Sequence, residues 1–473
     1  MTTAVEAPTG HYVGLPPKDG ICEFRGIRYA TAGRFAEPVQ QVAHQGTVVA
    51  DTFGGIAYQV PGFLELSQGM SVDDMSEDCH FLNIFVPDDA TPESKLPVLF
   101  WVHGGGFVNG SGSAEWYSGG NLARRAAVVV TINYRLGAFG YLGDRNLGLL
   151  DQVCALRWVR DNIVAFGGNP GNVTVFGESA GGSATVSLIA SPMTTGLIHR
   201  AWAMSPSIGQ YRDSETAGVI EQMFLEELGV ASLVKAMDVP ATEILDAQTR
   251  VSARRIGASD NFAPTHGGAG LLGHIVETAS LSPVPLAMGS NRDESRLWTA
   301  FDPAFAAKTE ADWTKHLDRI FGSAAGTARA VYEELRPGES YGQLITAVNS
   351  DVAFRQHVRE LANRRDAVSN PTWVYWFTWA STALGGQLGS CHALDIPFAF
   401  DNLDAPKVRG LIGHDADTGT LATEFADHIL HFAVHGHAAW AQYDRKNGAT
   451  LRMDLRSELL SHPENEIHSL FGN

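Results

Sequence analysis

The sequence predicts an α/β fold, with a mostly parallel central sheet and helices on both of its faces. From about Leu96 onward, short apolar runs of strand length alternate with longer runs of helical periodicity. This alternation is typical of parallel sheets that are covered by helices. The chain has 473 residues, of which 44% are hydrophobic and 18% charged, so it has an ordinary globular balance and can bury a large core.

Six segments rich in β-branched or aromatic residues are predicted as strands: 97–102 (PVLFWV), 126–134, 172–177, 200–205, 284–291 and 373–379. Residues 147–168 are predicted as a helix because Leu149, Val153 and Leu156 recur at spacings of three and four. The small residues of 182–191 predict a second helix that packs closely on the sheet. In such folds the active site lies beyond the carboxyl ends of the strands.

We interpret residues 1–473 as one catalytic domain. Two stretches, at about 208–270 and 300–365, interrupt the alternation of strands and helices and carry many acidic residues. Neither has a flank that resembles a linker, so we expect helical insertions that form a lid or the walls of a gorge. The chain contains no repeats and no low-complexity segment.

Charge and cysteine content narrow the classes of function. The 52 acidic and 34 basic residues give a net charge of −18, which argues against a nucleic-acid or anionic-membrane surface. No apolar run approaches the ~20 residues of a spanning helix, and the N-terminal segment does not resemble a signal peptide. The four cysteines are scattered and predict neither a zinc site nor a disulfide scaffold, so a cytoplasmic location is expected.

The pattern G-x-S-x-G, which places a nucleophilic serine on a tight strand-to-helix turn, occurs twice. GESAG at 177–181 follows a predicted buried strand and precedes a predicted helix, as the chemistry requires. GESYG at 338–342 follows a helical run that ends at a proline, which predicts a solvated turn for Ser340. Ser179 is therefore the candidate nucleophile.

A serine nucleophile needs hydrogen-bond donors for the oxyanion that forms during acyl transfer. HGGGF at 103–107 directly follows the strand 97–102, as the oxyanion loop of lipases and esterases does. Its glycines expose backbone N–H groups, and the N–H of Ala180 would add another. A phosphate-binding loop is the weaker alternative, because the next strand ends in Asn133 rather than in a ribose-binding acid.

The remaining members of a triad are expected in the order acid, then histidine. Asp293 and Glu294 follow the strand 284–291, and spacing alone leaves the choice between them open. His392 lies in a small-residue loop after the strand 373–379. The adjacent Cys391 could suggest a thiol dyad, but neighbouring residues on a loop seldom point together.

The sequence resembles the type-B carboxylesterase and cholinesterase family of α/β-hydrolases. The resemblance runs through FRGIRYA at 24–30, SEDCHFLNIFVP at 76–87, HGGGF, NYRLGAFGYL at 133–142, the long segment ending on GESAGG, GSNRDES at 289–295 and CHALDIPFAF at 391–400. It implies an α/β-hydrolase fold and a bacterial serine carboxylesterase, similar to para-nitrobenzyl esterases. Such an enzyme forms an acyl-enzyme intermediate and needs no cofactor.

The resemblance also implies roles for individual residues. It selects Glu294 as the acid, which gives the catalytic triad Ser179, Glu294 and His392. It implies Gly105, Gly106 and Ala180 as the oxyanion hole, and a buried polar network behind the triad formed by Glu178, Ser205 and Asp395. Many relatives pair the cysteine of SEDC with one upstream that is missing here, so Cys79 is expected to be a free thiol. Phe107, Trp202 and Phe398 are the expected pocket residues.

The sequence also allows other interpretations of individual residues and of the function. His431, His435 and His437 have helical spacing, but solvated or core histidines are far more common than metal ligands in such a context. The same triad could act on a carbamate or an amide. A non-catalytic interaction protein of the same fold is a remote alternative that the intact triad disfavours. The expected partner is a small ester substrate, and the sequence leaves monomer and homodimer equally open.

Overall fold

The computed structural model describes residues 3–68, 72–254, 262–415 and 417–472. Residues 255–261 of the first predicted insertion, and residues 1, 2, 69–71, 416 and 473 elsewhere in the predicted domain, lie outside this part. Within it, a ten-stranded sheet has the order β15-β14-β13-β12-β11-β10-β8-β9-β7-β3. Its strands are β3 (Ile21–Arg28), β7 (Phe81–Pro87), β8 (Leu96–Val102), β9 (Val128–Ile132), β10 (Gly168–Glu178), β11 (Arg200–Met204), β12 (Leu286–Asn291), β13 (Thr372–Phe377), β14 (Ala449–Met453) and β15 (Glu458–Ser461).

The neighbouring strands β9, β8, β10, β11, β12, β13 and β14 pair in parallel. At the edges of the sheet, β15 pairs antiparallel with β14, β7 with β9, and β3 with β7. The α/β-hydrolase fold and the six predicted strands are thus confirmed. The remaining strands form two small sheets: β1 (Ala4–Ala7), β2 (Gly10–Gly14) and β6 (Thr47–Ala50) in one, and β4 (Ala30–Thr31) and β5 (Val39–Gln40) in the other.

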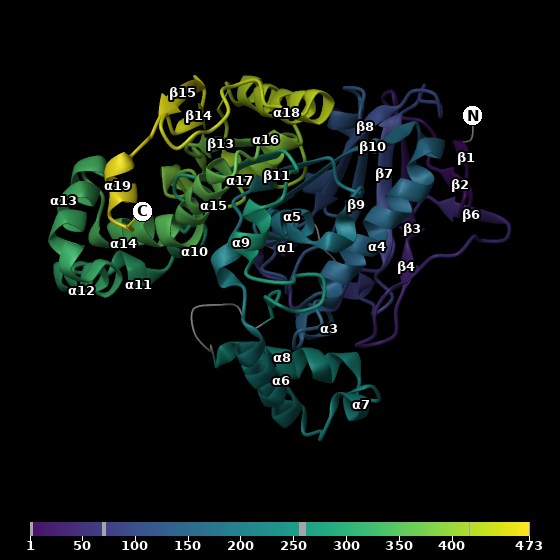
Figure 1. Cartoon of the computed structure of the whole chain (residues 1–473), viewed down its shortest axis with the longest axis horizontal. Helices are drawn as coiled ribbons and strands as arrows, with labels where there is room; N and C mark the ends of the chain where they lie inside the picture. Colours follow the sequence, from purple (N-terminus) through teal and green to yellow (C-terminus); the bar gives the residue numbers. More distant parts are fainter. Residues whose placement is uncertain (1–2, 69–71, 255–261, 416, 473) are drawn as a thin grey trace.

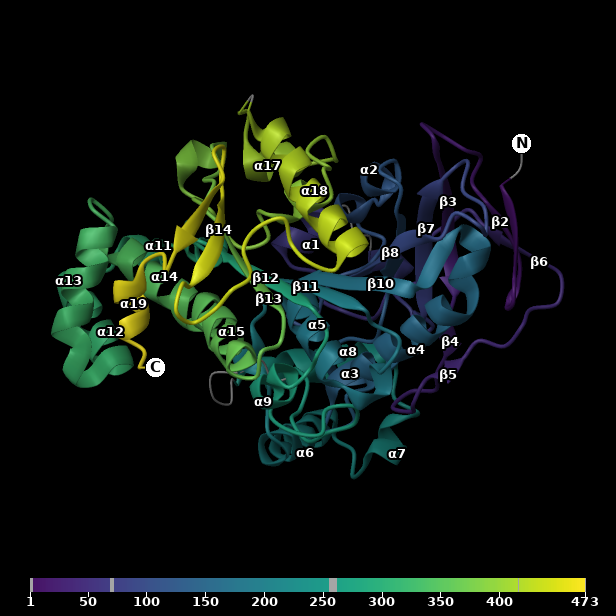
Figure 2. The ribbon, with the colours of Figure 1, turned by 45° about the horizontal axis from the view of Figure 1, so that its top comes forward.

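Helices cover both faces of the sheet, and others form the two insertions (Figure 1 and Figure 2). They are α1 (Phe63–Ser67), α2 (Gly120–Ala123), α3 (Gly137–Tyr141), α4 (Leu147–Asn162), α5 (Ala180–Ala190), α6 (Ser214–Leu228), α7 (Leu233–Ala236), α8 (Ala241–Ala253), α9 (Ile275–Ser280), α10 (Arg296–Thr299), α11 (Pro303–Ala306), α12 (Glu310–Phe321), α13 (Ala325–Leu335), α14 (Tyr341–Ser350), α15 (Gln356–Ala367), α16 (Ile396–Ala399), α17 (Val408–Ile412), α18 (Thr418–His435) and α19 (Asn465–Ser469). In Figure 2 the central strands run across the middle, with α17 and α18 above them and α5, α9 and α15 below.

Alternation of side chains along the central strands builds a separate core on each face. On β10, Val173 and Val175 belong to the core that contains α4 and α5, whereas Phe176 belongs to the core under α18. Successive side chains of a strand point to opposite faces, and both faces are buried here, so the segment 173–176 is mostly apolar. Because these strands are parallel, the carboxyl ends of β8, β10, β12 and β13 lie along the same edge of the sheet, with β11 between β10 and β12.

Both stretches that the sequence marked as insertions contain helices, although residues 262–270 of the first one mainly form turns. Helices α6, α7 and α8 lie below the sheet in Figure 1, and α6 packs against α8. Helices α11 to α14 form a lobe at the left of the same view. A third core, which includes Trp313, Tyr332 and Ile467, joins this lobe to the C-terminal helix α19.

All four cysteines, Cys22, Cys79, Cys154 and Cys391, are buried and unpaired, as expected for Cys79. Burial raises the pKa of the Cys391 thiol well above its usual range, which keeps the thiol protonated beside His392. In the part of the chain that the structure describes, no helix is both long and apolar enough to cross a membrane.

Candidate active site

Ser179 occupies a strained turn between β10 and α5. Its backbone angles, φ 59° and ψ −122°, are unusual for a residue with a side chain and cost roughly 1–3 kcal/mol. Close packing holds the turn, because a Cβ on Gly177 would lie 2.5 Å from the carbonyl oxygen of Gly181, and one on Gly181 would lie 2.0 Å from that of Val102. The two glycines of GESAG are therefore required by contact, and the strand-to-helix turn presents the serine at the end of the sheet.

The glycine loop that follows β8 lies against this turn. A Cβ added to Gly104 would lie 3.1 Å from the Cβ of Ser179. The next two residues, Gly105 and Gly106, have φ values of +106° and +60°, which favour glycine. Ala180 begins α5, where the first backbone N–H groups have no partner within the helix. The candidate oxyanion donors thus lie on two segments that touch at Ser179.

His103 supports the loop and does not face the triad. Burial lowers the pKa of its imidazole to about 4, so the ring is neutral at pH 7. Its Nδ1 is 2.8 Å from the carbonyl oxygen of Gly104, and its ring stacks on Tyr134 at 4.5 Å between centroids. These contacts agree with a role in shaping the loop.

Glu294, and not Asp293, contacts the histidine. Glu294 Oε2 lies 2.6 Å from His392 Nδ1. The other carboxylate oxygen, Oε1, accepts hydrogen bonds from Ser205 Oγ at 2.6 Å and from the backbone N–H of Asn291 at 2.7 Å. Asp293 instead accepts a hydrogen bond from the backbone N–H of Ser390 at 3.0 Å. Of the two candidate acids, Glu294 therefore contacts His392 and Asp293 contacts the backbone of the histidine loop.

The second imidazole nitrogen, His392 Nε2, lies 3.1 Å from Glu178 Oε1, without the alignment of a hydrogen bond. Because Glu178 immediately precedes Ser179, this contact places Nε2 at the nucleophile turn. Asp395 lies behind it and accepts hydrogen bonds from Asn291 Nδ2 and the Tyr375 hydroxyl, both at 3.3 Å. The three predicted network residues therefore surround the pair formed by Glu294 and His392.

This cluster of carboxylates controls the protonation of His392. Burial opposes the imidazolium, but the neighbouring charges of Glu178 and Glu294 outweigh it and raise the pKa of His392 to about 9. Burial in turn raises the pKa of Glu178 to about 8 and that of Asp395 to about 7. The charges of Glu178 and Glu294 therefore favour the protonated form of His392.

We expect Glu178→Gln to move the acid limb of the pH profile of kcat/KM to lower pH. The family resemblance implies that His392 is the general base. A general base works only when it is neutral, so we expect activity to fall as pH falls through the pKa of His392. Removing the adjacent carboxylate lowers this pKa, and the variant should keep activity at a pH where the parent has lost it. The measurement is kcat/KM on p-nitrophenyl acetate between pH 5 and pH 10.

Glu424→Gln is the matched control, because Glu424 pairs with His428 on α18 at 3.6 Å, away from this site. Its acid limb should coincide with that of the parent. An acid limb that stays in place in Glu178→Gln, or that moves to higher pH, would contradict the electrostatic role of Glu178.

Two aromatic residues that the sequence did not single out contact the His392 ring. The ring centroid of Trp298 is 5.0 Å from that of His392, and the centroid of Phe354 is 4.7 Å from it. Trp298 follows Glu294 by four residues, a helical spacing that could have indicated it. Phe354 comes from the second insertion and carries no signal in the sequence.

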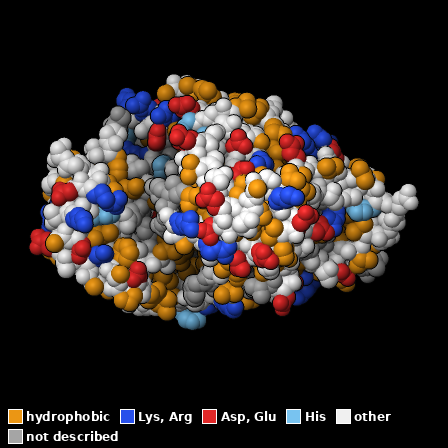
Figure 3. All heavy atoms as spheres, turned by 90° about the horizontal axis from the view of Figure 1, so that it is seen from below, with side chains coloured by type: hydrophobic (Ala, Val, Ile, Leu, Met, Phe, Trp, Pro, Cys, Tyr) orange, Lys and Arg blue, Asp and Glu red, His pale blue; other side chains and the backbone are white. Residues whose placement is uncertain are grey.

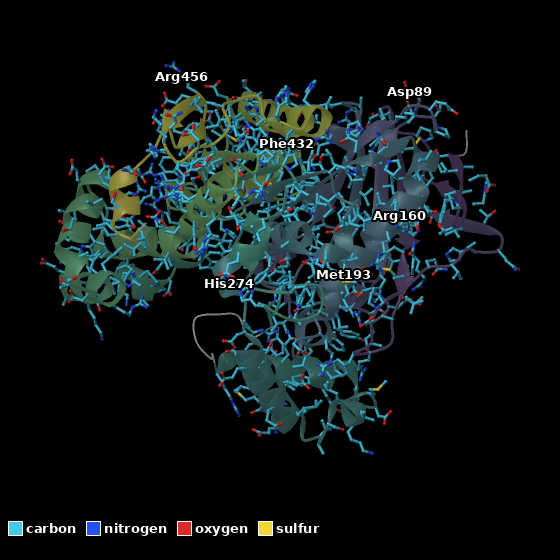
Figure 4. The ribbon with its side chains drawn as sticks, in the orientation of Figure 1. Asp89, Arg160, Met193, His274, Phe432 and Arg456 are labelled. Atoms are coloured by element: carbon cyan, nitrogen blue, oxygen red, sulfur yellow. The ribbon has the colours of Figure 1, made fainter. Side chains whose placement is uncertain are left out.

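All three expected pocket residues are buried in the core. Trp202 is fully buried on β11 and packs against Phe432, which is labelled in Figure 4, at 5.7 Å between centroids. Phe398 is fully buried against Phe377 and Trp379. Both side chains fill the layer between the sheet and the helices α16 and α18, so we withdraw them from the pocket. Phe107, the last residue of the glycine loop, is 1% exposed and packs against Tyr141 and Tyr211 in the other core, so it does not line the cavity described below either.

An apolar cavity of about 840 Å³ lies beside the acid turn and the histidine loop. Among its lining residues, Leu297 comes three residues after Glu294 and Leu388 four residues before His392; the others are Leu64, Leu66, Trp116, Phe301, Leu384, Lys407, Gly410 and Leu411. Lys407 is the only charged side chain among them. Figure 3 shows that the lower face of the molecule is hollowed beside the α11–α14 lobe, with hydrophobic side chains around the hollow.

The three histidines His431, His435 and His437 do gather at the end of α18, with ring centroids 4.4 to 5.8 Å apart. Across the described residues, no group of three or more His, Cys, Asp or Glu side chains is arranged to hold a metal ion. Ser340 of the second G-x-S-x-G pattern is exposed and caps α14, where its hydroxyl accepts from the backbone N–H of Gln343 at 3.3 Å.

Comparison with known proteins places this geometry in a family. The carboxylesterase family model matches residues 2–468. The para-nitrobenzyl esterase of Bacillus subtilis is 32% identical over 95% of this chain and 94% of its own length, and a probable N-octanoylanthranilate hydrolase of Rhodococcus erythropolis is 33% identical over 94% and 97%. The crystal structure of the Geobacillus stearothermophilus carboxylesterase EST55 superposes with a TM-score of 0.87 at 31% identity, covering 99% of this chain and 100% of that one.

Proposed function

Because the chain belongs to the carboxylesterase family and is thus a serine carboxylesterase, we propose that Ser179, His392 and Glu294 are its catalytic triad. The observation that carries this assignment is the chain of contacts around His392. Nδ1 is held by Glu294 at 2.6 Å, and Nε2 faces the residue that precedes Ser179. Labelling of Ser179 by a fluorophosphonate probe tests this assignment directly.

Acylation begins when His392 Nε2 takes the proton of Ser179 Oγ. The oxygen attacks the carbonyl carbon of the ester, and the carbonyl oxygen becomes an oxyanion that Gly105, Gly106 and Ala180 stabilise through their backbone N–H groups. The intermediate then collapses. The bond between the carbonyl carbon and the alcohol oxygen breaks, and His392 returns its proton to the departing alcohol.

Deacylation repeats these steps with water. His392 removes a proton from water, the hydroxide oxygen attacks the acyl carbon, and the proton returns to Ser179 Oγ as the carboxylic acid leaves. His392 is an imidazolium midway through each half-reaction, and Glu294 stabilises that charge. Ser205 and Asn291 hold the Glu294 carboxylate in place, which keeps the proton of the neutral ring on Nδ1 and leaves Nε2 free to accept.

We propose that the apolar cavity receives the hydrocarbon part of the ester. A cavity of about 840 Å³ falls within the usual range for small-molecule sites. Its leucines, Trp116 and Phe301 offer dispersion contacts and few polar partners. Small polar esters would gain little binding free energy in this cavity. Longer acyl or alkyl groups would be stabilised there because their apolar surface is removed from water.

We therefore expect kcat/KM to rise along a p-nitrophenyl ester series from acetate to octanoate. Each buried methylene contributes about 0.8 kcal/mol, which corresponds to about fourfold in kcat/KM until the cavity is filled. Leu66→Trp should reduce the advantage of octanoate about tenfold and leave acetate within about twofold, because the larger ring occupies the cavity. Steady-state kinetics on the series measure both effects.

Leu459→Trp is the matched control, since Leu459 is a similarly exposed leucine on β15. It should reproduce the parent series. If kcat/KM of the parent protein did not change along the ester series, the proposed role of the cavity would be wrong, and the assignment of the triad would stand. A parallel series of alkyl acetates distinguishes an acyl from an alcohol subsite, and matched carbamate and anilide substrates test the alternative leaving groups.

A further inference from the structure

We propose that Trp298 and Phe354 are positioning residues for His392. This inference rests on the proposed function of His392 as the general base. The ring centroids of the three residues form a triangle with sides of 4.7, 5.0 and 6.4 Å, and the Trp298 and Phe354 planes are nearly parallel, at 5°. Two aromatic faces from different segments therefore meet the same imidazole.

Phe354 is held rigidly. Its side chain is buried, and it belongs to a π-helical turn, Asp351–Arg355, between α14 and α15. Single π-helical turns often occur at functional sites. Asp351 Oδ2 accepts a hydrogen bond from the Tyr332 hydroxyl at 2.8 Å, and Arg355 is ion-paired with Glu464 and lies over the ring of Trp376 at 4.1 Å. These contacts anchor the turn on both sides of Phe354.

The segment that carries Trp298 is tied to the same region. The backbone N–H of Ser295 donates to Ser350 Oγ at 3.0 Å, and the hydroxyls of Thr299 and Thr346 are 3.0 Å apart. The acid turn therefore reaches α14, which leads directly into the π-helical turn. Both aromatic rings are placed relative to Glu294 as well as to His392.

The exposure of Trp298 distinguishes the two rings. Its relative accessibility is 57%, so core packing does not explain a tryptophan at this position. The His392 ring beside it is only 3% exposed. The exposed Trp298 ring therefore covers the His392 imidazole on the solvent side, and the buried Phe354 ring contacts the imidazole from the protein interior.

This arrangement has a chemical consequence because His392 is transiently an imidazolium. A cation within about 6 Å of an aromatic face is attracted by the ring quadrupole. The carboxylates that face His392 are Glu178, Glu294 and Asp395, and the two rings add an attraction that does not depend on the protonation of these groups. They also restrict rotation of the imidazole away from Glu294.

The test compares Trp298→Ala and Trp298→Phe with the parent protein on p-nitrophenyl acetate, a substrate too small to need the apolar cavity. We expect Trp298→Ala to lower kcat on the order of tenfold, within the range of a cation–π contact, with KM unchanged within about twofold. Trp298→Phe should restore most of kcat because it keeps an aromatic face. Trp298 is exposed, so the variants should fold, which thermal unfolding confirms.

Trp440→Ala is the matched control, since Trp440 contacts His428 at 5.1 Å on α18, and it should keep the parent kcat. His392→Ala separates the two hypotheses. If His392→Ala is inactive and Trp298→Ala has the parent kcat, the positioning role is wrong and the triad stands. If His392→Ala is active, the proposed triad itself is wrong. A loss in Trp298→Ala that appears only in KM would assign the ring to substrate binding and overturn the positioning role.

Discussion

Replacing Ser179 with alanine is expected to lower kcat by about six orders of magnitude, as loss of a serine nucleophile does in other triads. An alanine side chain has no oxygen that can attack the ester, so no acyl-enzyme can form. Residual hydrolysis would come only from the oxyanion donors and substrate binding. Steady-state kinetics measure the loss, and a fluorophosphonate probe should label the parent protein at Ser179 and leave the variant unlabelled.

Ser340→Ala is the control for this experiment, because the chain offers the same pentapeptide pattern in a different setting. Ser340 is an exposed helix cap, and its removal should cost about 1 kcal/mol of stability at most and no activity. If labelling persisted in Ser179→Ala, or disappeared in Ser340→Ala, the assignment of the nucleophile would be wrong.

Glu294→Gln is expected to lower kcat by about 10⁴, the magnitude seen when a triad carboxylate becomes an amide. The Glu294 Oε2 to His392 Nδ1 contact of 2.6 Å requires an acceptor opposite a ring N–H. A glutamine can present its NH₂ group instead, which favours the imidazole tautomer that cannot take the serine proton. It also removes the charge that stabilises the imidazolium. The loss should appear in kcat and in kcat/KM on p-nitrophenyl acetate.

Asp293→Asn is the adjacent control. Asp293 accepts from the backbone N–H of Ser390 at 3.0 Å, and an asparagine oxygen can replace that acceptor. We expect less than a tenfold change in kcat, from small shifts of the loop before His392. Equal losses in the two variants would mean that Asp293 contributes to orienting His392 as strongly as Glu294 does.

Much of the fold followed from local pattern. The six predicted strands correspond to β8 to β13, because strands buried on both faces carry short, mostly apolar runs that are visible in the sequence. The helix predicted over 147–168 ends at Asn162 as α4 and continues as a 3₁₀ turn to Phe166. The order of serine turn, acid turn and histidine loop could be predicted for the same reason, since each motif lies at the end of a strand.

The pocket could not be predicted in this way. Trp202 and Phe398 were expected there because they are large and aromatic, but alternation on β11 directs Trp202 into the core under α18, and Phe398 fills the same layer. The cavity is lined instead by residues from five separate stretches between Leu64 and Leu411. Only the packing of those stretches brings them together.

Local sequence was enough to specify six of the ten strands of the sheet, the serine between two glycines, the glycine loop and the two candidate acids, because each depends on residues that are close along the chain. Tertiary packing selected the acid that contacts His392, the rings that surround it and the place where a substrate could bind. Glu294 and His392 are 98 residues apart in the chain, and their contact of 2.6 Å depends on how two strand ends are aligned. Contacts of this kind depend on the packing of the whole sheet and its helices, which local sequence patterns do not predict.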